Sequence, residues 1–300
     1  MDKGVYVYST IIVLVLIVII LGYSGLLTKM TGYGTSDTTS LNISVGNNPP
    51  TIGTVEAITA KNPTDDTTTS ITFNFTATDA DGAANLNPAT AQGYFQRAGE
   101  TTRSNTSCVE LTTSGNSANY SCTILMWYYD QNGAWTINVT IQDDSGAYVE
   151  NSTTTFTYNL LPGMKMSPTS LTWASITMGQ TDVGSNNDPI QVNNTGNDVD
   201  VSINVTSYNL RGEQTTTEYI YANNFTIENA SQGCSGTAMS NATSINVTSA
   251  ILQRGNHSLN YDNATSGQEQ TYFCLKGLPS GISQQSYSSA AYGSWTIQII

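Results

Sequence analysis

The sequence predicts an all-β protein in which two β-sandwich domains follow one N-terminal transmembrane helix, and two patterns support this class. The first is an uncharged apolar run near the N-terminus, which is typical of a membrane span. The second is an alternation of apolar and polar residues in short segments bounded by Gly, Pro and Asn. That alternation is typical of strands with one buried face.

The apolar run covers residues 5–27, after a short tail of residues 1–4. A helix of that length spans about 34 Å, which is enough for a bilayer core. Lys3 and Lys29 flank the run on its two sides. We therefore expect a signal anchor that holds the protein in the lipid bilayer as a single-pass membrane protein, with residues 28–300 extracellular.

Two other kinds of N-terminal processing fit the same stretch. A secretory signal would be cut near the small residues Gly22 and Ser24, although the apolar run continues through Leu27. In addition, Lys3-Gly4 directly before an apolar run resembles the processing site of archaeal type IV pilin-like precursors. This resemblance, which covers about residues 1–25, implies cleavage after Gly4 and an apolar stretch that packs in a filament core.

The composition narrows the class of partner. Charged residues make up only 10% of the chain, and 9 Lys and Arg against 22 Asp and Glu give a net charge of −13. Binders of nucleic acid need a basic face, so we expect no nucleic acid partner. We expect other surface proteins or glycans instead.

Glycosylation sequons of the form N-x-[ST] occur along the whole chain. Their spread favours a glycoprotein, although Asn-x-Thr is also common at strand edges and turns. The sequons begin at Asn42, Asn74, Asn105, Asn119, Asn138, Asn151, Asn193, Asn204, Asn224, Asn229, Asn241, Asn246, Asn256 and Asn263.

The cysteines favour two disulfides, because their number is even and the predicted location is extracellular. Four cysteines allow three connectivities. We expect the local pairs, Cys108 with Cys122 and Cys234 with Cys274, because each half of the chain reads as its own domain.

Residues 28–47 are rich in Gly, Ser, Thr and Asn, and they read as a flexible stalk that precedes the first domain, residues 48–161. We expect a hairpin at Asn132-Gly133, because Asn-Gly is a strong turn signal between strands. The strands expected in this domain are residues 70–78, 93–97, 107–110, 118–128, 134–142 and 153–160.

About seven short strands separated by turn signals predict an immunoglobulin-like (Ig-like) sandwich. Residues 48–161 also resemble the Ig-like and cadherin-like modules of archaeal and bacterial surface proteins. The resemblance rests on three motifs, DADG at residues 79–82, YYDQNGAW at 128–135 and VTIQDDSGA at 139–147. It implies a fold and says almost nothing about a ligand.

Leu161-Pro162-Gly163 marks the boundary to a second sandwich, residues 162–300. Its turn Asn194-Thr195-Gly196-Asn197 resembles a hairpin of Ig-like repeats in archaeal surface proteins. The strands expected in this domain are residues 170–176, 189–193, 199–205, 224–228, 244–248, 271–276 and 295–300.

Enzymatic chemistry is hard to assign from these residues. His257 is the only histidine, and it reads as a loop residue within a sequon. The chain contains no nucleophile elbow, P-loop or zinc ligand set. The cluster Trp127, Tyr128, Tyr129 and Trp135 reads as core, with a carbohydrate platform as the alternative.

Calcium is the one metal for which the sequence offers ligands. Asp79, Asp81, Asn85 and Asn87 lie in one loop, and Asp143 and Asp144 lie in a second turn that could fold to the same end of the sandwich. Calcium binds six to eight oxygens from such loops. The alternative is ordinary turn chemistry, because Asp and Asn start turns through their own side chains.

These observations predict a non-enzymatic, glycosylated structural or adhesion protein of the cell surface. A pilin-like filament subunit cleaved after Gly4 is the alternative, and a surface hydrolase is the third class, for which we can assign no acid–base pair.

Overall fold

The computed structural model describes residues 12–16, 40–231, 233–254 and 267–300, and the chain divides into two units, residues 1–46 and 47–300. In the first unit, residues 12–16 are helical and residues 40–46 form neither helix nor strand. Most of the expected membrane span and stalk lies outside the described residues. Within the part of the chain that is described, no helix has the length and hydropathy of a membrane span.

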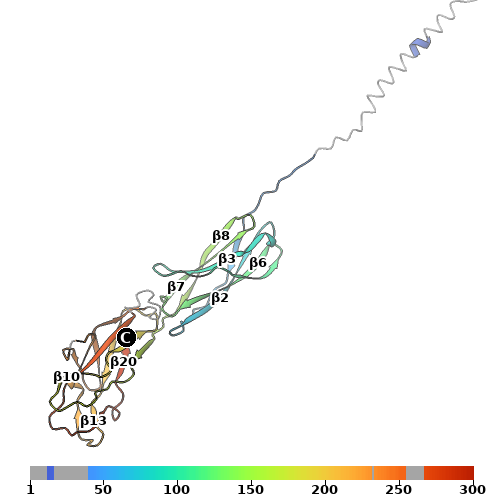
Figure 1. Ribbon diagram of the computed structural model, residues 1–300. Helices are drawn as coiled ribbons and strands as arrows, with labels where there is room; N and C mark the ends of the chain where they lie inside the picture. The colour runs from blue at the N-terminus through green and yellow to red at the C-terminus, as the bar shows by residue number, and fades with distance from the viewer. Residues whose placement is uncertain (1–11, 17–39, 232, 255–266) are drawn as a thin grey trace, which may run out of the picture. The chain divides into compact units, whose positions relative to one another are not determined.

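The second unit is all-β, and its first part, residues 51–158, is called the first β region here. It consists of two antiparallel sheets with strand orders β1-β2-β6-β5 and β4-β3-β7-β8 (Figure 1). Its strands are β1 (Thr51–Val55), β2 (Thr68–Thr78), β3 (Leu86–Gln96), β4 (Arg103–Asn105), β5 (Val109–Ser114), β6 (Ser117–Trp127), β7 (Gly133–Asp143) and β8 (Tyr148–Tyr158), and a 3-10 turn, η1 (Ala83–Asn85), precedes β3.

Buried and outward-facing residues alternate along the longest of these strands. In β2, Ile71, Phe73, Phe75 and Ala77 are buried while the residues between them face outward. The whole of β2 pairs with β6, from Thr68 opposite Trp127 to Thr78 opposite Ser117. The inward faces of both sheets close one hydrophobic core, so the region is a β-sandwich.

The hairpin expected at Asn132-Gly133 is wrong, because the strands on its two sides belong to different sheets. β6 pairs with β2 and β5, whereas β7 pairs with β3 and β8. Gly133 has a φ of 111°, and Asn132 does not share the positive φ that a two-residue type I′ turn needs. The Asn-Gly signal therefore located a sharp bend but not the partner of the next strand.

The second β region, residues 164–299, holds its own hydrophobic core. Its sheets have strand orders β16-β15-β18-β11-β9, with β10 also on β18, then β17-β12-β20 and β14-β13-β19. Its strands are β9 (Met164–Ser167), β10 (Thr181–Gly184), β11 (Ile190–Asn194), β12 (Val201–Ser207), β13 (Leu210–Gly212), β14 (Tyr219–Ile220), β15 (Phe225–Glu228), β16 (Thr237–Ala238), β17 (Thr243–Leu252), β18 (Gln268–Gly277), β19 (Tyr287–Ser288) and β20 (Thr296–Ile299), with a 3-10 turn, η2 (Ala222–Asn224), before β15.

The strand expected at residues 170–176 is wrong, because this segment forms no ladder. Side-chain oxygens of Asn187 and Asn186 accept the backbone N–H groups of Thr172 and Ala174, which a neighbouring strand would otherwise bond. Trp173 still packs toward the core, with its ring 5.1 Å from that of Phe225. The apolar pattern of this segment therefore indicates its packing against the core, but the segment is not a strand.

The turn at residues 194–197 is not a hairpin either. β11 before it pairs with β9 and β18, and β12 after it pairs with β17 and β20. The turn carries the chain from one sheet to another, and its side chains form hydrogen bonds with the preceding chain.

Candidate functional site

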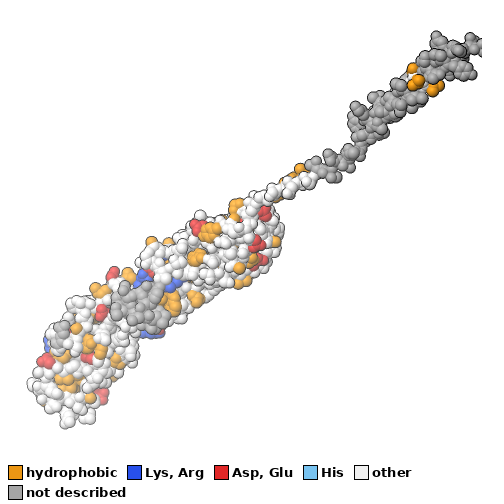
Figure 2. Space-filling view, turned by 45° about the horizontal axis from the view of Figure 1, so that its top comes forward, with side chains coloured by type: hydrophobic (Ala, Val, Ile, Leu, Met, Phe, Trp, Pro, Cys, Tyr) orange, Lys and Arg blue, Asp and Glu red, His pale blue; other side chains and the backbone are white. Residues whose placement is uncertain are grey.

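The acidic loops and the start of the first β region meet at one end of that region, which we call the entry end. Asp79 and Asp81 follow β2, and Asp143 ends β7. Asn47 and Asn48 bring the chain to these carboxylates. Figure 2 shows acidic side chains gathered at this end on a surface that is otherwise mostly neutral.

Two asparagines fasten the entering chain. The Asn47 amide donates to Asp143 Oδ2 at 2.8 Å, and Asn48 donates to Asp81 from its backbone N at 2.7 Å and from its amide at 2.8 Å. The hydrogen bond from the Asn48 backbone N–H is the main cause that lowers the pKa of Asp81, and the bond from the Asn48 amide adds to it. The bond from the Asn47 amide is the main cause that lowers the pKa of Asp143. These carboxylates therefore act as caps for the incoming chain.

Asp79 is fully buried, and its carboxylate accepts hydrogen bonds from residues of its own loop. Its Oδ1 accepts the N–H of Asp81 at 2.8 Å, and its Oδ2 accepts the Asn85 amide at 3.2 Å. Asn85 in turn donates to Asn47 Oδ1 at 3.3 Å. These are the hydrogen bonds of an ordinary Asx turn, which is the alternative to a calcium site.

The six candidate calcium ligands are therefore only partly brought together. Asp79, Asp81, Asn85 and Asp143 join one network through Asn47 and Asn48. Asn87 instead caps Ala89 at 3.2 Å and lies opposite Gln142 in the β3–β7 ladder, and Asp144 contributes its backbone N–H to Asn85 at 2.8 Å.

Among the described residues, no group of three or more Asp, Glu, His or Cys side chains is arranged to hold a metal ion. Calcium stays a prediction, and a calcium titration of the melting of the first β region would test it. Sequence reasoning missed Asn47 and Asn48, because it placed Asn47 at the end of the stalk and Asn48 at the start of the first domain without a contact for either.

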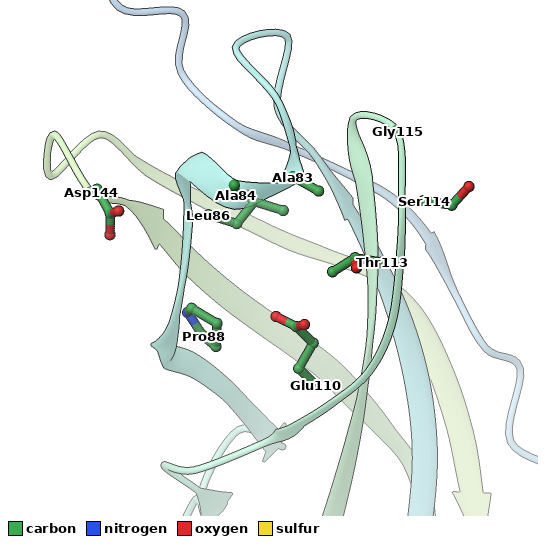
Figure 3. Close-up of a pocket in the computed structure, with 9 residues that line it drawn as sticks. All are labelled: Ala83, Ala84, Leu86, Pro88, Glu110, Thr113, Ser114, Gly115 and Asp144. Carbon is green, nitrogen blue, oxygen red and sulfur yellow. The ribbon is translucent and has the colours of Figure 1, made fainter.

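A shallow groove of about 460 Å³ lies beside this network, between β5 and the start of β3. Figure 3 shows Glu110 of β5 pointing into the groove, with Ala84, Leu86 and Pro88 along its opposite wall and Asp144 at its margin. Strand β4 covers β3 only from Gly93 to Phe95, so the beginning of β3 has no strand partner on this side among the described residues.

The second network joins the two β regions, and it is built by the turn at residues 194–197. Asn197 is fully buried, and its amide donates to the carbonyls of Asp130 and Asn159, both at 3.0 Å. Its Oδ1 accepts the N–H of Leu161 at 2.7 Å, and its own N–H donates to the Leu161 carbonyl at 3.1 Å. One asparagine thus satisfies four backbone groups of the preceding chain.

Gly196 allows this close approach. A Cβ at that position would overlap the Leu161 carbonyl oxygen, so no side chain fits without a backbone shift. The backbone N–H of Thr195 donates to the Gly163 carbonyl at 2.9 Å beside it. The turn at residues 194–197 therefore joins the two regions through close backbone packing and buried hydrogen bonds. We call residues 194–197 and their partners the junction.

Ion pairs surround the junction. Arg103 pairs with the buried carboxylate of Asp130, and burial is the main cause that raises the pKa of that carboxyl. Arg254 of the second β region pairs with Glu100 of the first and also donates to the Tyr129 carbonyl at 2.8 Å. A buried ion pair that loses one partner leaves an uncompensated charge. Each pair therefore stabilises the contact between the two segments that carry its partners.

Tyr128, Tyr129 and Trp135 are buried, as the core interpretation predicted, whereas Trp127 is half-buried with its ring centroid 5.6 Å from that of Tyr129. Trp135 is fully buried and donates its indole N–H to the Gln131 carbonyl at 2.8 Å, and Tyr128 and Tyr129 are 3% and 2% exposed. His257 lies outside the described residues. The disulfides are the two local ones, Cys108–Cys122 and Cys234–Cys274.

The sequons divide by exposure. Asn42, Asn241 and Asn246 are exposed, whereas Asn105 already donates its amide to the Thr123 carbonyl at 2.9 Å. The other described sequon asparagines are half-buried, and these are Asn74, Asn119, Asn138, Asn151, Asn193, Asn204, Asn224 and Asn229. Asn256 and Asn263 lie outside the described residues.

Comparisons with known proteins identify no family. No family model matches the chain, and no curated protein matches it. Among solved structures, it is similar to dimeric latent PorU from Porphyromonas gingivalis, with 10% sequence identity and a TM-score of 0.28. That alignment covers 86% of this chain and 20% of PorU, so the chain spans about a fifth of that protein's length.

Proposed function

We propose that this chain is a non-enzymatic surface protein, in which a membrane helix of residues 5–27 holds two Ig-like modules outside the cell as a structural or adhesion subunit. The two modules correspond to residues 48–161 and 162–300. The disulfide in each β region supports an oxidising, extracytoplasmic location.

Strand order supports the Ig-like assignment of the first module. Named in chain order as A, B, C, C′, D, E, F and G, its strands form one sheet A-B-E-D and one sheet C′-C-F-G. That is the immunoglobulin arrangement with one added strand. The disulfide departs from the antibody pattern, because it links Cys122 in strand E to Cys108 just before strand D.

The junction is the observation that carries the structural role. Modules joined in one chain usually move relative to each other unless their interface is extensive. Here Asn197 and Gly196 restrain that motion through buried backbone hydrogen bonds between the β regions, and Arg254 adds an ion pair across them. A pair of modules joined in this way can transmit force or present a binding surface that both modules share.

The mature N-terminus tests the anchor. The full chain, expressed in its native cell type, should begin at or near Met1, stay in the membrane fraction after alkaline extraction, and lose residues 28–300 when intact cells are treated with protease. Reduced cysteines together with protease resistance on intact cells would contradict an extracellular location.

The same measurement separates the alternatives. An N-terminus at Val5 together with filaments in micrographs would replace the anchor with the pilin-like subunit. Cleavage after Ser24 and recovery from the medium would make the protein secreted rather than anchored. Each outcome has its own mass, so intact-protein mass spectrometry distinguishes them directly.

A further inference from the structure

One short segment before the first β region has the pattern of a strand without a strand partner. Leu41, Ile43 and Val45 alternate with Asn42 and Ser44, which is the period-two pattern of a half-buried strand. The three apolar side chains are 82%, 72% and 83% exposed, and the segment belongs to no described sheet (Figure 1). We call residues 41–45 the donor segment.

The first β region has an edge that matches such a segment. β5 ends its sheet, and all of its residues are exposed, with Val109 and Leu111 at 62% and 51%. Proteins usually protect long edges with Lys, Pro or a covering segment. β5 has no Lys, Pro or covering strand among the described residues. Its only charge is Glu110, and its pairing with β6 shifts register between Glu110 and Thr112.

The edge strand of the other sheet is covered at one end, which makes the contrast informative. β8 ends that sheet, and Lys61 covers its C-terminal end by donating its backbone N–H to the Thr157 carbonyl at 2.9 Å and by forming a bridge with Tyr158. β1 and β4 are shorter than β5. β5 lacks even such a partial cover within the described part of the chain.

We propose that the donor segment of one copy pairs with β5 of a second copy, so that the chain associates with itself by strand addition. The two lengths match, because five extended residues span about 17 Å and β5 has six residues. Main-chain hydrogen bonds would supply the pairing, and the apolar alternation would orient the added strand. This inference goes beyond the proposed surface role and does not require the membrane anchor.

A second copy is favoured over pairing within one chain. Only Gly46 separates the donor segment from Asn47, whose side chain is bonded to Asp143. Pairing within one chain would require a reversal at that single residue, whereas the tightest strand reversals use two. A neighbouring copy has no such constraint.

Cross-linking between two variants, each with one added cysteine besides the four in the native disulfides, tests the proposal. Full chains that carry Asn42→Cys are mixed with full chains that carry Thr112→Cys, and a short bismaleimide is added, whose span tolerates a slip in register of one or two residues. A link between positions 42 and 112 can then form only between chains. We expect a dimer that contains this link, identified by peptide mapping.

Two further substitutions separate strand addition from chance contact. Ile43→Lys, added to the Asn42→Cys chain, charges the apolar face and should reduce the link at least tenfold. Ser44→Lys in the same background is the matched control, because it charges the polar face, and the link should persist. Unchanged melting and intact native disulfides in both variants show that the β regions remain folded.

Three results would overturn the proposal. One is no 42–112 link in the mixture. Another is an equal loss of the 42–112 link with Ile43→Lys and with Ser44→Lys, which would mean that the membrane segment or charge alone brings the two chains together. The third is an intrachain link in a doubly substituted chain without any link in the mixture, which would show that the segment covers its own β5.

Discussion

The two β regions satisfy their backbone hydrogen bonds in different ways. In the first, long strands bond each other, as in the ladder between β2 and β6. In the second, short strands alternate with loops whose N–H groups bond to side-chain oxygens. Gln285 Oε1, for example, accepts from Gln214 and Thr215 at 2.8 and 2.7 Å.

This difference shows where sequence patterns are informative. A ladder imposes period two on its residues, because inward and outward positions alternate. A loop held by Asn and Gln imposes no period, because those side chains reach the backbone from many positions. The second region therefore depends on particular side chains, and single substitutions in its loops should matter more than they do in the loops of the first.

The largest expected effect comes from removing one core aromatic from each region. Trp135→Ala and Phe225→Ala each remove a buried ring, which costs about 3–5 kcal/mol. We expect Trp135→Ala to speed hydrogen exchange mainly in the first region and Phe225→Ala mainly in the second. Equal acceleration in both regions by either variant would show that the two cores unfold as one.

Removing the disulfides compares the two regions by loop length. The sequence separations are 14 and 40 residues, so chain entropy predicts losses of about 3 kcal/mol for Cys108→Ala/Cys122→Ala and about 4 kcal/mol for Cys234→Ala/Cys274→Ala. Denaturant unfolding of each double variant measures these losses. A larger loss in the first region would contradict the entropy argument and assign the difference to packing.

The junction should show a smaller effect that reaches both regions. Asn197→Asp keeps the shape but loses the amide donors to the Asp130 and Asn159 carbonyls, and each unsatisfied buried group costs about 1–3 kcal/mol. We expect lower stability and new exchange at residues 159–163. The exposed Asn223→Asp is the matched control, and an equal effect from it would remove the junction's special role.

Lowering the pH should have the smallest effect on stability. The sign of that effect should differ between two carboxylates of the second region. The Tyr287 hydroxyl and Ser283 lower the pKa of Glu218 to about 2, so its contribution is complete above about pH 4.5 and is lost as the pH falls toward 2. Burial raises the pKa of Asp188, so its ionised form is disfavoured in the fold, and protonation as the pH falls favours the folded state.

Melting temperatures of two variants against pH test these signs. Glu218→Gln should reduce the loss of stability between pH 4.5 and 2. Asp188→Asn should remove a gain that the wild type shows as the pH falls toward the ordinary pKa of an aspartate. If neither variant changes the slope of melting temperature against pH, other carboxylates dominate, with Asp81 and Asp143 at the entry end as the next candidates.

The sequence by itself determined the all-β class, most strands of the first region and the candidate calcium ligands as a set of residues. It did so because alternation, turn residues and oxygen-bearing side chains are local properties. The tertiary structure alone decided which strands pair, and it corrected the hairpins at Asn132-Gly133 and at residues 194–197. Pairing depends on packing between sheets, which no local pattern records.

The same distinction applies to the sites. Sequence reasoning found Asp79, Asp81 and Asp143 but not Asn47 and Asn48, because an asparagine before two prolines has no periodic signature. It found the turn at residues 194–197 but not its role, because Asn197 donates hydrogen bonds to carbonyls more than thirty residues away in the sequence. Those partners are brought together only by folding, which buries the groups and makes each hydrogen bond necessary.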